Sequence, residues 1–322
     1  MPTIETLGEN ESLRRTISRL GTSASALVGP GDDAAVVAAP DGRFVVTTDT
    51  MVEGHDFRLD WSNAYDLGYK AVATNVADVA AMGAVPTSLV VSLICPKTTE
   101  ISWLESFADG LRDGCQTLAP AASVVGGDLA SGTQLVISVA AHGDLQGRDP
   151  VLRSGAKPGD VLAVGGTLGR AACGLALLLS GNQDAINSYD EWVGWQLRPQ
   201  PPIALGAVAA EAGATSMLDI SDGLAKDAAR IARASNVTIQ IDSRQLQGFE
   251  AILEGAAQAI DADPRAWVLG GGEDHSLLTT FAADATLPRG FKAIGRVLPS
   301  GKHEVLLDDQ PVDEIGWDSV AG

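Results

Sequence analysis

The sequence predicts a protein of two domains, each built from helices and strands. At 322 residues the chain is long for one hydrophobic core, and 45% apolar residues would give each half a core of its own. Amphipathic helical stretches alternate with short apolar runs that are typical of strands. The segment 143–160 is rich in Gly, Pro and charged residues and separates two apolar halves. We therefore expect a domain of residues 1–145 followed by one of residues 146–322.

The first half begins with an amphipathic helix over residues 4–20, which Gly21 ends. A longer helix is expected over 63–82, because Asn63 can cap its start with Asp66 in the first turn. The other elements expected here are strands at 35–38, 44–48 and 90–94, a helix at 103–118, and strands at 124–125 and 135–140 on either side of a loop that contains Gly126-Gly127-Asp128.

The second half begins with a strand at 161–164 that runs into Gly165-Gly166-Thr167-Leu168-Gly169 and a helix at 171–179. This junction has the look of a phosphate loop, but the pattern GxxxxGK[ST] is absent, and such junctions are more often packing features. A strand at 214–220 leads into Ser221-Asp222-Gly223 and a further amphipathic helix. Ser221 or Asp222 could be nothing more than the N-cap of that helix.

Charge and cysteine content exclude several classes of protein. The net charge of −19 and the pI near 4.4 leave no basic stripe for a nucleic acid. Cys95, Cys115 and Cys173 are widely spaced, so neither a disulfide framework nor a zinc site is indicated. The N-terminus lacks the pattern of a signal peptide, and no apolar run is long enough to span a bilayer. We expect a cytoplasmic protein with no nucleic-acid or membrane partner.

Acidic residues recur beside glycines and small hydroxyl residues at the ends of apolar runs. These stretches contain almost no Lys or Arg, so we expect a metal ion as the counter-charge. Mg²⁺ fits best, because it is bound by one or a few carboxylates together with substrate phosphates. Any single Gly-Asp or Asp-Gly pair could serve only to form a turn, whereas six such stretches together favour a metal site. The six stretches are Gly31-Asp32-Asp33, Thr47-Thr48-Asp49, Asn75-Val76-Ala77-Asp78, Gly126-Gly127-Asp128, Asp219-Ile220-Ser221-Asp222-Gly223 and Gly270-Gly271-Gly272-Glu273-Asp274.

Alternation along an extended chain shows which of these side chains face together. Thr47 and Asp49 lie on one side of their strand, and Thr48 on the other. Pairs of a hydroxyl and a carboxylate suit octahedral Mg²⁺ with phosphate oxygens in the remaining positions. A glycosidase would be expected to have a cleft rich in aromatic residues, which make up only 5% of this chain, and the EF-hand spacing of a Ca²⁺ loop is absent. Phosphoryl transfer, which depends on positioning and charge neutralisation, remains.

The motifs are specific enough to resemble a known family, and they are collinear with it from about residue 29 to the C-terminus. The chain resembles the thiamine-monophosphate kinases of the aminoimidazole-ribonucleotide-synthetase-like superfamily. The resemblance implies an α+β N-terminal domain followed by an α/β C-terminal domain. It also implies ATP-dependent phosphorylation of thiamine phosphate to thiamine diphosphate by direct transfer, with several Mg²⁺ ions, in a homodimer formed through the N-terminal domains. The motifs are the six stretches above, extended to Asp33-Ala34-Ala35, Asp49-Thr50, Asp78-Val79-Ala80-Ala81-Met82-Gly83-Ala84 and Gly223-Leu224, together with Arg153-Ser154-Gly155-Ala156-Lys157-Pro158-Gly159-Asp160.

The resemblance also implies roles for individual residues. Arg153 would bridge phosphate oxygens with its forked guanidinium, although it could be a solvated linker residue. Trp317 would contact thiamine, although a Trp at this position could equally be a packing residue. The implied Mg²⁺ ligands are Asp33, Thr47, Thr48, Asp49, Asp78, Asp128, Asp219 and Asp222. The implied ATP contacts are Gly127, Asp128, Arg153 and Ser221, the implied substrate contacts are Asp56, Glu273 and Trp317, and the residues expected to carry catalysis are Asp49, Asp128 and Arg153.

One loop departs from the family pattern. The family commonly has His-Phe after Thr-Asp-Thr, where this chain has His55-Asp56-Phe57. Counting from either side places Asp56 at the position of the substrate contact, with His55 one place early. Either residue could make the contact, and we assign it to Asp56.

Sister enzymes are the nearest alternatives. A selenophosphate synthetase would be expected to have a reactive Cys or selenocysteine near its start. A hydrogenase-maturation relative would be expected to have a C-terminal Cys. Neither residue is present in this sequence. Aminoimidazole ribonucleotide synthetase is harder to exclude, although Gly271-Gly272-Glu273-Asp274 and Trp317 favour the kinase. A Ca²⁺-stabilised binding protein without activity would explain the acidity but not Arg153.

Overall fold

The computed structural model describes residues 2–7, 9–28, 35–312 and 316. The chain forms two compact units. The first comprises Met1–Val79 and Ala84–Gly147, and the second comprises Ala80–Gly83 and Arg148–Gly322. None of the described helices is both long enough and apolar enough to cross a membrane.

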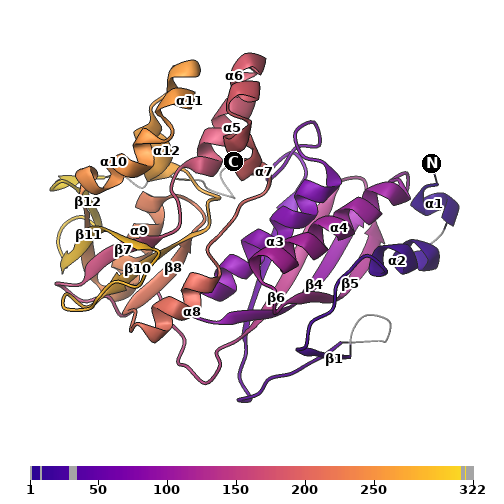
Figure 1. Ribbon diagram of the computed structural model, residues 1–322, viewed down its shortest axis with the longest axis horizontal. Coiled ribbons are helices and arrows are strands. Elements are labelled where there is room, and N and C mark those ends of the chain that lie inside the picture. Colours follow the sequence, from indigo (N-terminus) through magenta and orange to yellow (C-terminus); the bar gives the residue numbers. More distant parts are fainter. Residues whose placement is uncertain (1, 8, 29–34, 313–315, 317–322) are drawn as a thin grey trace. The chain divides into compact units, whose positions relative to one another are not determined.

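The first unit is a four-stranded sheet with two long helices on one face (Figure 1). The strand order is β3-β6-β4-β5, in which only the edge strand β5 runs parallel to its neighbour β4. Its elements are α1 (Ile4–Leu7), α2 (Glu9–Ile17), the antiparallel pair β1 (Ala26–Val28) and β2 (Val36–Val37), β3 (Val45–Val52), α3 (Ala64–Ala81), β4 (Val85–Cys95), α4 (Ile101–Leu118), β5 (Ser123–Ser131) and β6 (Val136–Asp144).

Local chemistry fixes the start of α3 and its contact with α4. Asn63 Oδ1 accepts from the backbone N–H of Asp66 at 3.0 Å, and Asp66 Oδ2 accepts from the N–H of Asn63 at 3.2 Å. This reciprocal pair satisfies two donors that the first helical turn would leave unpaired. The two helices then approach closely, because a Cβ added at Gly68 would lie 2.2 Å from the carbonyl oxygen of Phe107.

The second unit is a seven-stranded sheet in the order β13-β12-β9-β11-β7-β10-β8, in which only β12 and β9 pair in parallel. Its strands are β7 (Val161–Gly165), β8 (Ser216–Ile220), β9 (Val237–Ile241), β10 (Ser276–Phe281), β11 (Phe291–Pro299), β12 (Val305–Leu307) and β13 (Gln310–Pro311). Its helices are α5 (Arg170–Ser180), α6 (Gln183–Ser188), α7 (Asp190–Leu197), α8 (Ala204–Glu211), α9 (Leu224–Ser235), α10 (Ser243–Ala251), α11 (Glu254–Ala259) and α12 (Pro264–Gly270).

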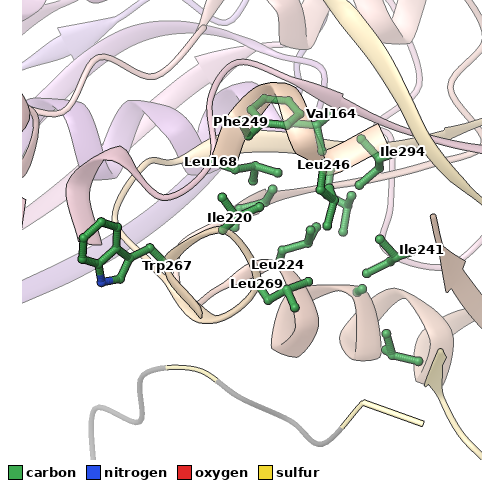
Figure 2. Close-up of a cluster of buried hydrophobic side chains, with 14 of the residues drawn as sticks. Val164, Leu168, Ile220, Leu224, Ile241, Leu246, Phe249, Trp267, Leu269 and Ile294 are labelled. Atoms are coloured by element: carbon green, nitrogen blue, oxygen red, sulfur yellow. The ribbon is translucent and has the colours of Figure 1, made fainter. Parts of the chain in front are cut away.

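The main core of this unit lies between the sheet and the helices α5, α9, α10 and α12. Figure 2 shows Ile220 of β8, Leu224 of α9 and Leu246 of α10 among its side chains, and all three are fully buried. Each such side chain stabilises the fold by about 1.5–3 kcal/mol relative to its exposed state. Because Ile220 and Leu224 lie on either side of the loop 221–223, this packing fixes both ends of that loop.

Three expectations from the sequence differ from the structure. Gly126-Gly127-Asp128 lies within strand β5 and not in a loop, because β5 pairs along its length with β4. The helix expected over 4–20 is two shorter helices, α1 and α2. Neither Ser221 nor Asp222 caps α9, whose N-cap position is Gly223.

Candidate functional site

In the first unit, strand β3 and helix α3 bring three of the expected metal ligands together. Thr47 Oγ1 donates to Asp78 Oδ2 at 2.7 Å. Asp49, two residues along the strand, shares the face of Thr47. Its backbone N–H donates to Asn75 Oδ1 at 3.2 Å, so Asn75 links the strand to the buried side of α3. A hydroxyl and two carboxylates are therefore held by one strand and one helix.

Thr48 does not join this group. It faces the opposite, exposed side of the sheet, and its hydroxyl donates to the carbonyl oxygen of Val139 at 2.8 Å. The alternation expected from the sequence is thus confirmed for Thr47 and Thr48. The side chain of Thr48 cannot bind the same ion as that of Thr47 in this arrangement.

Asp128 lies at the far edge of the same sheet. The register aligns Asp49 with Val139, Val91 and Gly127 in turn, across all four strands. Three strand spacings separate the two edges by about 14 Å. Asp128, one residue beyond Gly127, points to the opposite face from Asp49. Within one chain, Asp49 and Asp128 therefore cannot bind one metal ion.

Gly127 is a glycine because β5 passes very close to β4. A Cβ added there would lie 2.1 Å from the carbonyl oxygen of Val91, whereas a Cβ at the preceding Gly126 would meet nothing within 4 Å. Beside these glycines is an apolar cavity between α2, α4 and the sheet. Its lining includes Ile17, Leu111 and Gly127, and its volume of about 80 Å³ is too small for a heterocyclic base.

Asp56 and His55 lie in one turn after β3. Asp56 Oδ2 accepts from the backbone N–H of Val52 at 2.7 Å, and its Oδ1 lies 3.3 Å from His55 Nδ1. Asp56 therefore holds the turn in place, and both side chains remain partly accessible.

In the second unit, two loops join through their backbones. The N–H of Glu273 donates to the carbonyl oxygen of Ser221 at 3.0 Å, and the N–H of His275 donates to that of Ile220 at 3.1 Å. Glycines permit this approach, because a Cβ added at Gly272 would lie 2.1 Å from the Ser221 oxygen. Ser221 and Glu273 are thus neighbours although 51 residues separate them in sequence.

Asp219, the penultimate residue of β8, is a buried carboxylate beside an imidazole. Its Oδ2 lies 3.0 Å from Nδ1 of His275, and both side chains are less than 10% exposed. An imidazole in this position fixes the orientation of the carboxylate.

Two cationic side chains lie beside the carboxylate of Asp222. Arg230 Nη2 donates to Asp222 Oδ2, and Lys226 Nζ lies 3.6 Å from the same oxygen. Arg230 also donates to the fully buried Asp227 at 2.5 Å. Asp227 in turn accepts from the backbone N–H groups of Asp222 and Gly223, and burial raises its pKa to about 6. The carboxylate that accepts hydrogen bonds from the backbone N–H groups at the start of α9 is therefore that of Asp227.

Glu273 is held by a glutamine of α7. Gln196 Nε2 donates to Glu273 Oε2 at 2.5 Å, and Gln196 is buried. Glu273 has a left-handed backbone with φ of 65°, a conformation that costs free energy for a residue with a side chain. Nearby on α5 and α7, the guanidinium of Arg170 lies 4.6 Å from the ring centroid of Trp195.

In the glycine-rich segment before α5, Thr167 forms a hydrogen bond with a carboxylate of the protein itself, that of Asp274. Asp274 is buried, and its Oδ1 accepts from Thr167 Oγ1 at 2.8 Å. Its Oδ2 has no hydrogen-bond partner among the described residues. Burial raises the pKa of Asp274 to about 6. The structure supports the packing interpretation of this junction over a phosphate loop.

No contact among the residues that the structure describes brings the other expected site residues into these groups. Arg153 is exposed, and its carbonyl oxygen accepts from Ser235 Oγ at 3.1 Å. Asp33 and Trp317 lie outside the described residues. Within the described part of the chain, no group of three or more His, Cys, Asp or Glu side chains is placed to hold a metal ion.

The donor atoms differ in how well they suit Mg²⁺. Thr47, Asp49 and Asp78 offer hydroxyl and carboxylate oxygens, which are the hard ligands that Mg²⁺ prefers. Asp128 and Asp219 add carboxylates elsewhere. At Asp222 two cations already contact the carboxylate, so this residue does not fit a further cation without a change in its contacts.

Several residues of these groups were missed by the sequence analysis. Asn75 had a signal, since it stands three residues before Asp78 on the helix. His275 and Gln196 had none, because each reaches its carboxylate across a distance in sequence that only the fold closes.

Comparisons with known proteins agree with this architecture. Residues 31–145 match the family model of the AIR synthase related protein, N-terminal domain, and residues 157–307 match that of the C-terminal domain. The two-domain architecture expected from the resemblance is confirmed.

Relatives match along nearly the whole chain. A thiamine-monophosphate kinase of Mycobacterium tuberculosis is 46% identical over 99% of this chain and 93% of the relative, and one of Corynebacterium glutamicum is 39% identical over 99% and 95%. A structure of AaThiL complexed with AMPPCP and TMP has a TM-score of 0.79 at 31% identity, covering 96% of this chain and 94% of that one. The Stenotrophomonas maltophilia K279a thiamine-monophosphate kinase has a TM-score of 0.77 at 32% identity, covering 94% and 96%.

Proposed function

Because this chain belongs to the thiamine-monophosphate kinase family, we propose that it transfers the γ-phosphoryl group of ATP directly to thiamine phosphate, with several Mg²⁺ ions. An oxygen of the thiamine phosphate group attacks the γ-phosphorus, and the bond from that phosphorus to the β–γ bridging oxygen breaks. ADP leaves, and thiamine diphosphate forms. The enzyme's task is to position two anions and to neutralise their charge.

The proposed Mg²⁺ ligands on β3 and α3 are Thr47, Asp49 and Asp78. Asp128 of β5 and Asp219 of β8 are also proposed as Mg²⁺ ligands. Bound Mg²⁺ would neutralise charge on the phosphate oxygens. The contact of Thr47 with Asp78 supports this assignment, because it aligns a hydroxyl and a carboxylate before any ion binds. Asn75 would keep the strand at a fixed distance from α3.

The nucleotide is proposed to bind at β5. The open space at the Cβ position of Gly126 would let the phosphates approach the strand. Arg153 and Ser221 are proposed as phosphate contacts. A forked guanidinium suits phosphate oxygens that the metals leave free.

Glu273 is proposed to contact thiamine, whose thiazolium ring carries a positive charge. Its hydrogen bond from Gln196 fixes the carboxylate, which supports a role in orienting a cation. Asp56 is proposed as a second contact. Trp317 stays a proposed contact that lies outside the described residues.

A homodimer is proposed from the position of Asp128. Asp49 and Asp128 lie on opposite faces and opposite edges of one sheet, so a second copy would have to supply one of them to a shared site. The exposed face of the sheet carries Val46, which is 59% exposed, and Val90, which is 36% exposed. Apolar residues on an open sheet face suit contact with a second copy.

Mixing two inactive variants tests this dimer. If Asp49 of one copy works with Asp128 of the other, D49N and D128N that are unfolded and refolded together should regain activity. Half of the dimers would be mixed and one of their two sites intact, so about a quarter of wild-type activity is expected. Refolding each variant alone is the control, and no recovery in the mixture would contradict a shared site.

The observation that carries the proposed function is the match to thiamine-monophosphate kinases over 99% of the chain. The test is chromatography of products after incubation with ATP, Mg²⁺ and thiamine phosphate. ADP and thiamine diphosphate should form in equal amounts, and D49N should form neither. Consumption of ATP without thiamine diphosphate, or formation of aminoimidazole ribonucleotide from its precursor, would assign a different reaction.

A further inference from the structure

Two cations of helix α9 share the carboxylate of Asp222. Arg230 donates to its Oδ2, and Lys226 Nζ lies 3.6 Å from that oxygen. Each of the three side chains is less than a third exposed, so the charges are only partly screened by water. The positive charge that this carboxylate needs is therefore supplied from within the chain.

Arg230 is fixed in place by a second carboxylate. Its Nη1 donates to Asp227 at 2.5 Å, and Asp227 is fully buried. The other oxygen of Asp227 accepts from the backbone N–H groups of Asp222 and Gly223, at 3.0 and 3.1 Å. The planar guanidinium thus joins the loop to the helix with little freedom to move away.

A divalent cation at Asp222 would meet both of these positive charges. Moving Arg230 away would relieve the repulsion, but it would leave buried Asp227 without its counter-ion, a costly arrangement. Mg²⁺ also demands nearly ideal octahedral geometry and gives up its waters reluctantly. Fixed cations at this position avoid both costs.

We propose that Arg230 and Lys226 take the place of a divalent cation at Asp222, so that Asp222 is not a metal ligand in this enzyme. Asp222 and Arg230 are then positioning residues that hold the loop 221–223 and set its charge. The inference rests on the proposed function, since it concerns how many ions the nucleotide-bound enzyme holds.

The test is the number of Mn²⁺ ions bound per chain, measured by electron paramagnetic resonance with a non-hydrolysable ATP analogue. D222N should bind as many ions as the wild type, because the carboxylate that it removes holds none. K226Q/R230Q should bind one more, and D222N/K226Q/R230Q should return to the wild-type number. R233Q is the matched control on the same helix, since Arg233 pairs with Glu304 on the surface.

Loss of one Mn²⁺ in D222N would overturn the proposal, and so would an unchanged number in a folded K226Q/R230Q. If the double variant does not fold, the comparison of D222N with the wild type decides alone. The count needs no turnover, so it stands even if the wild type forms no thiamine diphosphate. That second result would instead refute the proposed function.

Discussion

Asp274 makes the stability of the second unit depend on pH. Burial raises its pKa from 3.8 to about 6, so the folded protein keeps this proton over a pH range in which the unfolded chain has lost it. The protonated Asp274 carboxyl stabilises the fold fully below about pH 4, and this stabilisation is lost as the pH rises to about 6. About two pH units at about 1.4 kcal/mol each correspond to a loss of about 3 kcal/mol at neutral pH.

Asp274→Asn should remove this dependence. The amide oxygen can still accept from Thr167, and no charge is buried. About half of the loss is already present at pH 5, so the stability of the variant relative to the wild type should rise by about 1–2 kcal/mol from pH 5 to pH 7.5. Urea unfolding followed by circular dichroism at these two pH values measures the change, and it avoids the pI near 4.4, where precipitation is expected.

Asp284→Asn is the control, because Asp284 is an exposed carboxylate of the same unit. Its stability relative to the wild type should change little over the same range. A difference between Asp274→Asn and the wild type that stays constant from pH 5 to pH 7.5 would refute the reasoning, because it would show that folding does not perturb this carboxyl group.

Four further substitutions test the first unit. Asp49→Asn and Asp128→Asn should each lower kcat by at least about 100-fold with the fold retained, because the amide keeps the size but not the charge, and near-normal turnover at saturating Mg²⁺ would contradict this. Gly127→Ala should raise KM for ATP and destabilise the fold by about 1–3 kcal/mol, because the added methyl would meet a carbonyl of β4 at 2.1 Å. Gly126→Ala, with open space at its Cβ, is its control, and equal effects of the two in thermal unfolding would argue against the close approach. Asp56→Asn should raise KM for thiamine phosphate and leave KM for ATP nearly unchanged, since the amide still accepts the turn hydrogen bond; equal changes in both constants would count against the contact.

Local signals predicted the parts of the fold that local chemistry determines. The start of α3 was predicted because Asn63 and Asp66 form their reciprocal hydrogen bonds within one turn. The shared face of Thr47 and Asp49 follows from alternation along a single strand, which holds in any sheet.

The features that the sequence did not predict depend on contacts between distant segments. Gly126-Gly127-Asp128 reads as a turn, and only pairing with β4 makes it a strand. Asp222 stands in a stretch without cations, yet Arg230 reaches it from two helical turns along α9. His275 meets Asp219 across 56 residues, and no local pattern marks such a pair.

The close packing of the two loops of the second unit restricts how the proposed contact with thiamine can be changed. A Cβ at Gly223, Gly271 or Gly272 would lie 2.1–2.6 Å from a backbone oxygen, so random libraries built on these loops should yield mostly misfolded proteins. Gln196 has no such restriction, because it reaches Glu273 through its side chain from a separate helix. Laboratory evolution toward thiamine analogues should therefore begin on α7, where the contacts of Glu273 can be varied while the loops keep their shape.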